Sequence, residues 1–360
     1  MGKLLIVIAL AVLLALVLYL AYAGLYQRPE ALPQTTSSWL SQQNESLAGT
    51  PAYPTLKAGE LLGISYGNIA SASENRSGAA ADLGMLYDAN VTAIRIDLNY
   101  GPWIDGNATQ ISTYDAFVYN ISANNKTLII ADAAAEYYRQ HQLPWSQFKA
   151  AWVQRVAEIS ARYHPAYYIV VKEPPWYFPM ISGSPLLVPF NASDWANLTA
   201  QLAAAVKRAS PDTQVGVAVS GDVYHQQRGP LDLQYLEQVE KIQNVSFIGF
   251  DVYGPTAWND TQRFIDTYGA GGKQVWIAET WSSTSTQLFN QSREALDSQW
   301  ISTVYLFAES LHAQYIVPFF TNLFASYRQT ANGTYIPASF YQNRTPAFYA
   351  YKNITPINNP

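Results

Sequence analysis

The sequence predicts an α/β protein whose body is a (β/α)8 TIM barrel, preceded by an N-terminal hydrophobic membrane anchor or signal segment. Short apolar runs alternate with longer amphipathic stretches eight times between residues 61 and 352, which indicates a parallel sheet. These roughly 290 residues suit eight strand–helix units, which typically need about 250 before insertions. An open doubly wound sheet is the alternative, but the turn at 67–71 lacks the glycine-rich phosphate motif that this fold favours.

Each predicted strand is a run of β-branched, aliphatic or aromatic residues that ends at charged or turn-forming ones. In chain order, we predict strands at 61–66, 91–99, 127–132, 167–173, 214–220, 245–253, 274–279 and 315–321. The second strand is the most informative, because its apolar residues alternate with Arg95, Asp97 and Asn99. Alternate residues of a strand face opposite sides, so these three polar side chains share one face.

The predicted helices are amphipathic stretches with start or stop signals at several ends. In chain order, we predict helices at 79–89, 111–122, 145–163, 193–209, 233–242, 261–268, 293–312 and 346–352. Pro144 suits the start of the third helix, and Ser193 or Asp194 is a candidate cap for the fourth. Four residues, Gly269 to Gly272, follow the sixth helix and three of them are glycine, which favours a stop there.

The composition excludes several classes of function. The net charge is −5 with 21 lysines and arginines and no basic run, so nucleic acid is not an expected partner. The chain has no cysteine, which rules out disulfides and thiolate metal sites, and its four histidines show no metal-ligand spacing. No phosphate-binding or zinc-protease motif is present. We therefore expect no metal and no cofactor.

Three regions follow from the distribution of residue types. Residues 1–27 form a signal peptide or a transmembrane anchor, because Lys3 precedes an uncharged, mostly apolar segment from 4 to 26. Residues 28–55 are rich in Pro, Ser, Thr and Gln and are predicted to be a linker. Residues 56–360 form the barrel domain. Either reading of the first segment places the body outside the cell or at its surface.

Sequons for N-linked glycans are frequent, and their density fits a glycosylated outer surface. The motif Asn-x-Ser/Thr occurs at Asn44, Asn75, Asn90, Asn107, Asn120, Asn125, Asn191, Asn197, Asn244, Asn259, Asn290, Asn332, Asn343 and Asn353.

Two strands end in a glutamate in the same way. The fourth strand ends at Lys172-Glu173, where Pro174 prevents further pairing, and the seventh ends at Ala278-Glu279. In a barrel of this kind the C-terminal ends of the strands meet at one rim. Two carboxylates there can divide the roles of acid and nucleophile, as the cleavage of glycosidic bonds requires.

These motifs resemble those of the retaining glycoside hydrolases of the (β/α)8-barrel clan A, or four-seven superfamily, which includes cellulases, mannanases and galactanases. The resemblance covers the body of the chain from residue 61 onwards. It implies that Glu173 is the acid/base and Glu279 the nucleophile. It also implies that Arg95 on the second strand supports the nucleophile, although Arg95 could instead pair only with Asp97. Tyr253, at the end of the sixth strand, matches a tyrosine that bonds the nucleophile in the clan.

The chain departs from the clan at two places. Lys172 stands where the clan has an asparagine that binds the 2-hydroxyl of the sugar. Its charge is expected to lower the pKa of Glu173 unless it pairs with Asp132 or Asp222. The tryptophan of the clan's eighth strand has no match, and the polar residue at the end of that strand is Asn322. The predicted substrate-binding residues are therefore Arg95, Lys172, Trp176, Tyr253, Trp281 and Asn322, with the two tryptophans as stacking faces for a sugar.

The sequence thus predicts an extracellular retaining glycoside hydrolase that cleaves β-glycosidic bonds in poly- or oligosaccharides by double displacement. The alternative is a catalytically inactive barrel that binds glycans or forms part of a cell-surface assembly, which Lys172 favours. Sugar transfer by the same pair of glutamates is a third possibility, since only the acceptor would differ.

Overall fold

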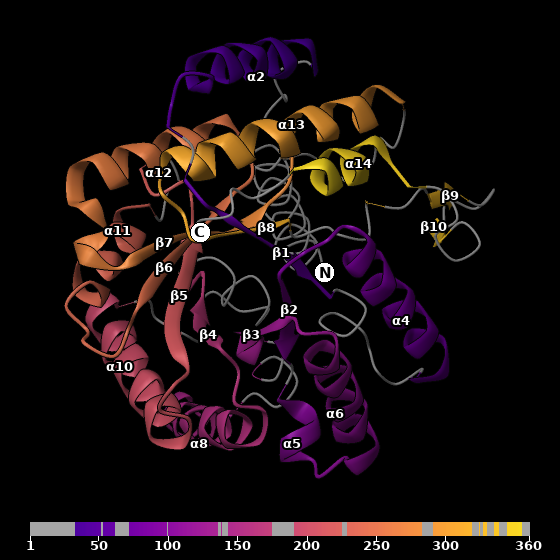
Figure 1. Ribbon diagram of the computed structural model, residues 1–360. Helices are drawn as coiled ribbons and strands as arrows, with labels where there is room; N and C mark the ends of the chain where they lie inside the picture. Colours follow the sequence, from indigo (N-terminus) through magenta and orange to yellow (C-terminus); the bar gives the residue numbers. More distant parts are fainter. Residues whose placement is uncertain are drawn as a thin grey trace, which may run out of the picture.

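Eight parallel strands form a closed barrel in which each strand pairs with the next along the chain and β8 pairs with β1 (Figure 1). The computed structural model describes residues 33–51, 53–61, 72–98, 100–135, 138, 143–174, 191–224, 229–282, 291–318, 324, 327–329, 335–337 and 344–354. The strands are β1 (Leu56–Glu60), β2 (Ala93–Leu98), β3 (Thr127–Asp132), β4 (Tyr167–Lys172), β5 (Gln214–Ser220), β6 (Phe247–Val252), β7 (Gln274–Thr280) and β8 (Tyr315–Pro318). The predicted barrel fold is confirmed.

Helices surround the barrel and follow its strands (Figure 1). They are α2 (Pro33–Leu47), α4 (Ala72–Asp88), α5 (Gly101–Ile104), α6 (Ala108–Ala123), α8 (Trp145–Tyr163), α10 (Ala192–Ala209), α11 (Gly229–Val239), α12 (Pro255–Tyr268), α13 (Gln291–Ser310) and α14 (Pro346–Asn353), with a 3-10 turn, η2 (Gly269–Gly272), after α12. A small antiparallel hairpin, β9 (Tyr327–Gln329) and β10 (Tyr335–Pro337), precedes α14.

Polar side chains cap several of these helices. The side chain of Asn191 accepts hydrogen bonds from the backbone of Ser193 and Asp194, so Asn191 is the cap of α10, two or three residues before the caps that we expected. Asn107 and Thr345 cap α6 and α14 in the same way. Each cap satisfies backbone N–H groups that the helix leaves without an internal acceptor.

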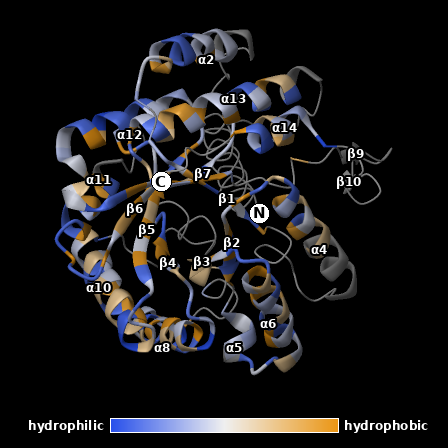
Figure 2. Cartoon of the chain, in the orientation of Figure 1, coloured by the Kyte–Doolittle hydropathy of each residue, from blue (hydrophilic) through white to orange (hydrophobic). Residues whose placement is uncertain are grey.

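The core has two compartments, one on each side of the strands. Small and aromatic side chains such as Ala58, Ala218 and Trp276 fill the lumen of the barrel. Aliphatic side chains of the opposite strand face pack with the surrounding helices in a larger outer core. Figure 2 shows hydrophobic residues gathered on the strands, with many hydrophilic ones on the helices. This division follows from the alternation of side chains along each strand.

Shifts in strand register change this alternation near the ends of β4 and β7. The pairing of β4 with β5 shifts between Ile169 and Val171, and that of β6 with β7 shifts between Phe250 and Asp251. An extra residue in one strand reverses the side to which the following residues point. After the shift in β4, Val171 belongs to the outer core and Lys172 reaches into the lumen.

The first strand differs from the prediction. We expected it at 61–66, but β1 comprises Leu56–Glu60, and residues 62–66 lie outside the described part of the chain. The sequence of β1, Leu-Lys-Ala-Gly-Glu, lacks an apolar run because Gly59 packs closely on Leu86. A Cβ at position 59 would lie 2.4 Å from Cδ2 of Leu86. The strand thus uses glycine for close packing, where the prediction looked for β-branched residues.

The stretch predicted as a linker, 28–55, contains the packed helix α2. Leu40 is buried, Trp39 lies edge-on to Trp258 at 5.2 Å between ring centroids, and Ser37 Oγ donates to Gln299 Oε1 at 2.7 Å. α2 therefore packs on α13 (Figure 1), so the predicted linker contains a packed helix at residues 33–47.

The predicted anchor or signal segment, 1–27, lies outside the described residues. Among the helices of the part that is described, none combines the length and the apolar character needed to cross a bilayer.

Candidate active site

Four side chains from three strands form a closed ring of alternating charge inside the barrel. Arg95 contacts Asp97 at 2.6 Å (Nε–Oδ1), and Asp97 contacts Lys172 at 2.8 Å (Oδ2–Nζ). Lys172 contacts Glu279 at 2.8 Å (Nζ–Oε1), and Arg95 Nη2 lies 2.6 Å from the same oxygen. All four side chains are at most 4% exposed. We call these four residues the charge ring.

The strands place the charge ring by alternation and by their register shifts. Arg95 and Asp97 lie two residues apart on β2 and so share its lumen face. Lys172 and Glu279 follow the shifts in β4 and β7. Gly249 on β6 makes room for β7, since a Cβ there would lie 2.5 Å from the Cβ of Ala278. The ring therefore depends on backbone register as well as on residue identity.

Both oxygens of Glu279 are held by donors. Oε1 contacts Arg95 Nη2 and Lys172 Nζ, while the hydroxyl of Tyr253 donates to Oε2 at 2.7 Å. Arg95 Nη1 also donates to the backbone oxygen of Ala278 at 2.8 Å, which fixes the guanidinium relative to β7. Burial raises the pKa of Tyr253 well above its usual value, and the charge of Glu279 raises it further. Tyr253 thus remains a neutral donor to the carboxylate.

Glu173 lies directly after β4, and its backbone N–H donates to the oxygen of Ala218 on β5 at 2.8 Å. Its φ is +39°, a left-handed conformation that is strained for any residue other than glycine and is found preferentially at functional sites. The side chain is buried with the rest of the residue, which is 9% exposed. The local backbone is thus bent at the position where the sequence predicts the acid/base.

Burial raises the pKa of Glu173 to about 8, and the charge of Glu279 adds to this effect. Lys172 lowers the pKa, as expected from its charge, but it does not outweigh these two causes. Glu173 is therefore a protonated carboxylic acid at neutral pH. Its neighbour Glu279 lies between two cations and a hydroxyl donor. The two carboxyl groups differ in the way that separates an acid from a nucleophile.

Two further carboxyl groups, Glu60 and Asp251, are buried in the lumen at the ends of β1 and β6. Burial raises the pKa of both well above the usual range, and the neighbouring carboxylates Asp97 (for Glu60) and Glu279 (for Asp251) add to it. For Asp97, burial acts in the same direction, but Arg95 and Lys172 outweigh it and lower its pKa. Within the charge ring itself, two cations face two carboxylates.

Neither Asp251 nor Glu60 is among the site residues that the sequence analysis predicts. The signal for Glu60 was available in principle, because a glutamate also ends β1. It was overlooked because that strand was predicted five residues too late.

Lys172 does not pair with Asp132, contrary to one expectation. Asp132 faces the outer core, where it accepts hydrogen bonds from the Tyr100 hydroxyl, the Trp152 indole and the backbone N–H of Ala134. Since residues of β3 alternate between the two sides, Asp132 and the lumen residue Ala131 point in opposite directions. The partners of Lys172 are Asp97 and Glu279.

Of the two tryptophans predicted to stack on a sugar, only Trp281 lies among the described residues. Trp281 is only 1% exposed and packs in the outer core against Phe324, at 5.5 Å between ring centroids. Its ring is covered, so the prediction that it offers an open face to a sugar is wrong in this structure. Trp176 and Asn322 lie outside the described residues, and their predicted roles stay predictions.

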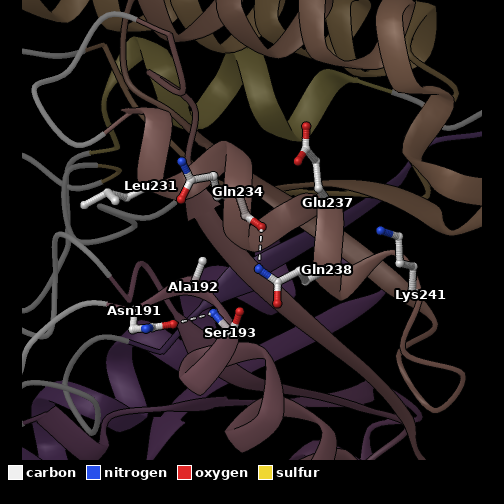
Figure 3. A pocket seen from close by; sticks show the side chains of 8 residues that line it. All are labelled: Asn191, Ala192, Ser193, Leu231, Gln234, Glu237, Gln238 and Lys241. Carbon is white, nitrogen blue, oxygen red and sulfur yellow. Dashed lines mark hydrogen bonds between the residues drawn. The ribbon is translucent and has the colours of Figure 1, made fainter.

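A separate surface pocket lies between α10 and α11 (Figure 3). Asn191 and Ser193 line it on one side, and Gln234, Glu237 and Lys241 line it on the other. It is formed by helices on the outside of the barrel and contains none of the predicted site residues. In the parts of the chain that the structure describes, no group of three or more His, Asp or Glu residues is placed to hold a metal ion.

Solved structures that share this architecture include glycosidases. An endo-1,4-beta-mannanase from Rhizomucor miehei aligns with a TM-score of 0.53 and 12% identity over 75% of this chain and 86% of its own. A beta-glucosidase from Thermotoga maritima aligns with a TM-score of 0.52 and 12% identity over 78% and 86%. A GH10 protein from Paenibacillus barcinonensis aligns with a TM-score of 0.51 and 12% identity over 86% and 96%.

The chain shares the closed (β/α)8-barrel fold of these proteins. At the level of sequence, no family model matches it and no curated protein matches it. The likeness therefore establishes the barrel architecture, and the chemistry rests on the residues described above.

Proposed function

We propose that this protein is a retaining glycoside hydrolase that cleaves β-glycosidic bonds in poly- or oligosaccharides, with Glu173 as acid/base and Glu279 as nucleophile. The observation that carries the proposal is the contrast between the two carboxyl groups at the ends of β4 and β7. Glu173 retains its proton at neutral pH, whereas Glu279 is ion-paired with Arg95 and Lys172. The shared fold with known glycosidases supports it.

The proposed reaction has two steps. In the first, Glu279 attacks the anomeric carbon, the bond to the leaving oxygen breaks, and Glu173 gives its proton to that oxygen. Glu279 then carries the sugar as an ester. In the second step Glu173 takes a proton from water, the water oxygen attacks the anomeric carbon, and the ester bond breaks with its electron pair returning to Glu279. The configuration is retained because the carbon is attacked twice.

The test is covalent trapping with 2-deoxy-2-fluoro glycosides that carry activated leaving groups, across β-glucosides, β-mannosides, β-galactosides and β-xylosides. At least one should add a single sugar to the protein, and peptide mass spectrometry should place it on Glu279. Glu279→Gln should not be labelled. Glu237→Gln, which changes a glutamate of the outer pocket, is the matched control and should label normally. A label on another residue, or none from the whole panel, would refute the proposed mechanism.

The inactive barrel remains the second candidate, because one specific observation favours it. Both oxygens of Glu279 already have donors, which weakens a nucleophile. Under this alternative, the protein would bind oligosaccharides in calorimetry but would neither turn over nor be labelled.

We further propose that the protein acts outside the cell or at its surface, as a glycoprotein tethered or exported by residues 4–26. The sequon asparagines whose side chains are described are all exposed, as acceptors must be. They are Asn44, Asn90, Asn107, Asn120, Asn125, Asn191, Asn197, Asn244, Asn259 and Asn353. Peptide mass spectrometry of the protein from its native host should find glycans on several of them. Recovery of an unmodified protein from the cytoplasm would contradict the assignment.

A further inference from the structure

We propose that the charge ring makes formation of the sugar ester the slow step of turnover, with Lys172 as a positioning residue that acts through Glu279. This inference rests on the proposed function and adds which of its two steps limits the rate. Lys172 stands at the position of the clan's sugar-binding asparagine, but here it forms ion pairs with Asp97 and with Glu279. Its ammonium group therefore acts on the carboxylate that changes charge during the reaction.

The ring stabilises Glu279 when it is a carboxylate. Two cations lie 2.6 and 2.8 Å from Oε1 in surroundings from which solvent is excluded, where such contacts are stronger than in water. Forming the ester removes the negative charge from Glu279, so the cations lose part of their stabilising interaction and the first barrier rises. Breaking the ester returns the charge, so the same contacts make Glu279 a better leaving group and lower the second barrier.

The charges balance throughout this sequence. Before the reaction the ring is neutral and Glu173 is protonated. In the ester intermediate the ring contains Arg95, Lys172 and only one carboxylate, that of Asp97, so it has one net positive charge. Glu173 has by then given its proton to the leaving group and has one negative charge. The positive ring thus stabilises the base that the second step requires.

Asp97 and Lys172 should therefore affect the two steps in opposite directions. Asp97 accepts hydrogen bonds from both cations and shares their charge with Glu279. Without the charge of Asp97, both cations interact more strongly with the carboxylate of Glu279, and ester formation becomes slower still. Removing the charge of Lys172 makes Glu279 a stronger nucleophile and a poorer leaving group. A residue that only stabilised the fold would not separate the steps in this way.

The experiment uses aryl β-glycosides of the sugar that labels Glu279, with phenols of graded acidity. For the unmodified protein, kcat should fall as the phenol becomes less acidic, and no burst of phenol should precede steady turnover. Lys172→Met should show a burst of one equivalent and a kcat that no longer depends on the phenol, because ester breakdown now limits. Asp97→Asn should lower kcat by about tenfold, for a barrier increase of the size of one ion-pair contact, and show no burst.

Lys273→Met is the matched control. Lys273 is a partly buried lysine on the outside of the barrel whose Nζ donates to the backbone oxygens of Ile242 and Val245, and its loss should leave the leaving-group dependence unchanged. If Lys172→Met does not fold, Asp97→Asn and the charge-preserving Lys172→Arg decide the matter, since neither should show a burst.

Two results would overturn the inference while leaving the proposed function intact. One is a burst in the unmodified protein, and the other is a shift of both variants in the same direction. Absence of any turnover or label would instead overturn the proposed function, and the inference with it.

Discussion

Two buried lysines, Lys57 on β1 and Lys172 on β4, lie on opposite sides of the barrel wall and have different neighbours. Lys57 points into the outer core and donates to four backbone oxygens, those of Ala89, Tyr351, Lys352 and Ile354, at 2.9 to 3.2 Å. Lys172 points into the lumen and contacts two carboxylates.

The difference shows how neighbours decide what a buried charge does. Backbone oxygens at the ends of α4 and α14 are fixed dipoles that do not change during a reaction, so Lys57 can only stabilise the fold. It fastens the last helix to the first strand by satisfying carbonyls that a helix end leaves without partners. A carboxylate can gain or lose charge, so Lys172 is coupled to chemistry at Glu279.

The largest expected effect comes from breaking the contacts of Lys57. Lys57→Met should lower the free energy of unfolding by about 3 kcal/mol, because several buried backbone oxygens lose their donor at once. The kcat measured below the melting temperature should not change. Thermal and urea unfolding, combined with kinetics on the sugar that labels Glu279, would check both parts. A fall in kcat without loss of stability would show that the two lysines do not differ as argued.

The next largest expected effect is on the pH dependence of activity, which should depend on Glu173 in the lumen and not on Lys57 on the outer side of the barrel wall. Glu173 must be protonated to act as the acid, so kcat/KM should fall tenfold per unit as pH rises above about 8. Since folding raises the pKa of Glu173 above its usual value, the folded state binds its proton more tightly than the unfolded state. The stability that this contributes is complete at low pH and is lost as pH rises through about 8. Glu173→Gln should flatten both dependences, whereas Lys57→Met should leave the activity profile in place.

The smallest expected effect comes from Asp132, a carboxylate that lies, like Lys57, on the outer side of the barrel wall. Asp132→Asn should cost about 1 kcal/mol of stability, because one of the donors Tyr100, Trp152 and Ala134 N–H loses an acceptor. Activity should be unchanged, since Asp132 faces away from the lumen. Urea unfolding measures the loss. A changed leaving-group dependence in this variant would mean that the outer core and the charge ring are coupled.

Much of the fold could be predicted from the sequence, because strands such as β3 and β5 are apolar runs whose predicted bounds, 127–132 and 214–220, equal those observed. The glutamates of the site could be predicted from their place at strand ends. The charge ring could not be predicted, since nothing in the sequence around Lys172 or Glu279 indicates the register shifts that turn both side chains inward. β1 was misplaced because its packing depends on Gly59 and on the capping role of Lys57, which hydrophobic pattern does not reveal.

The two register shifts have a consequence for how this site could be lost or gained. If β4 paired with β5 without its shift, strict alternation after Ile169 would turn Lys172 out of the lumen and dismantle the charge ring without replacing any of its residues. The chemistry of this site therefore depends on how its strands pair, and two barrels with the same rim residues need not have the same chemistry.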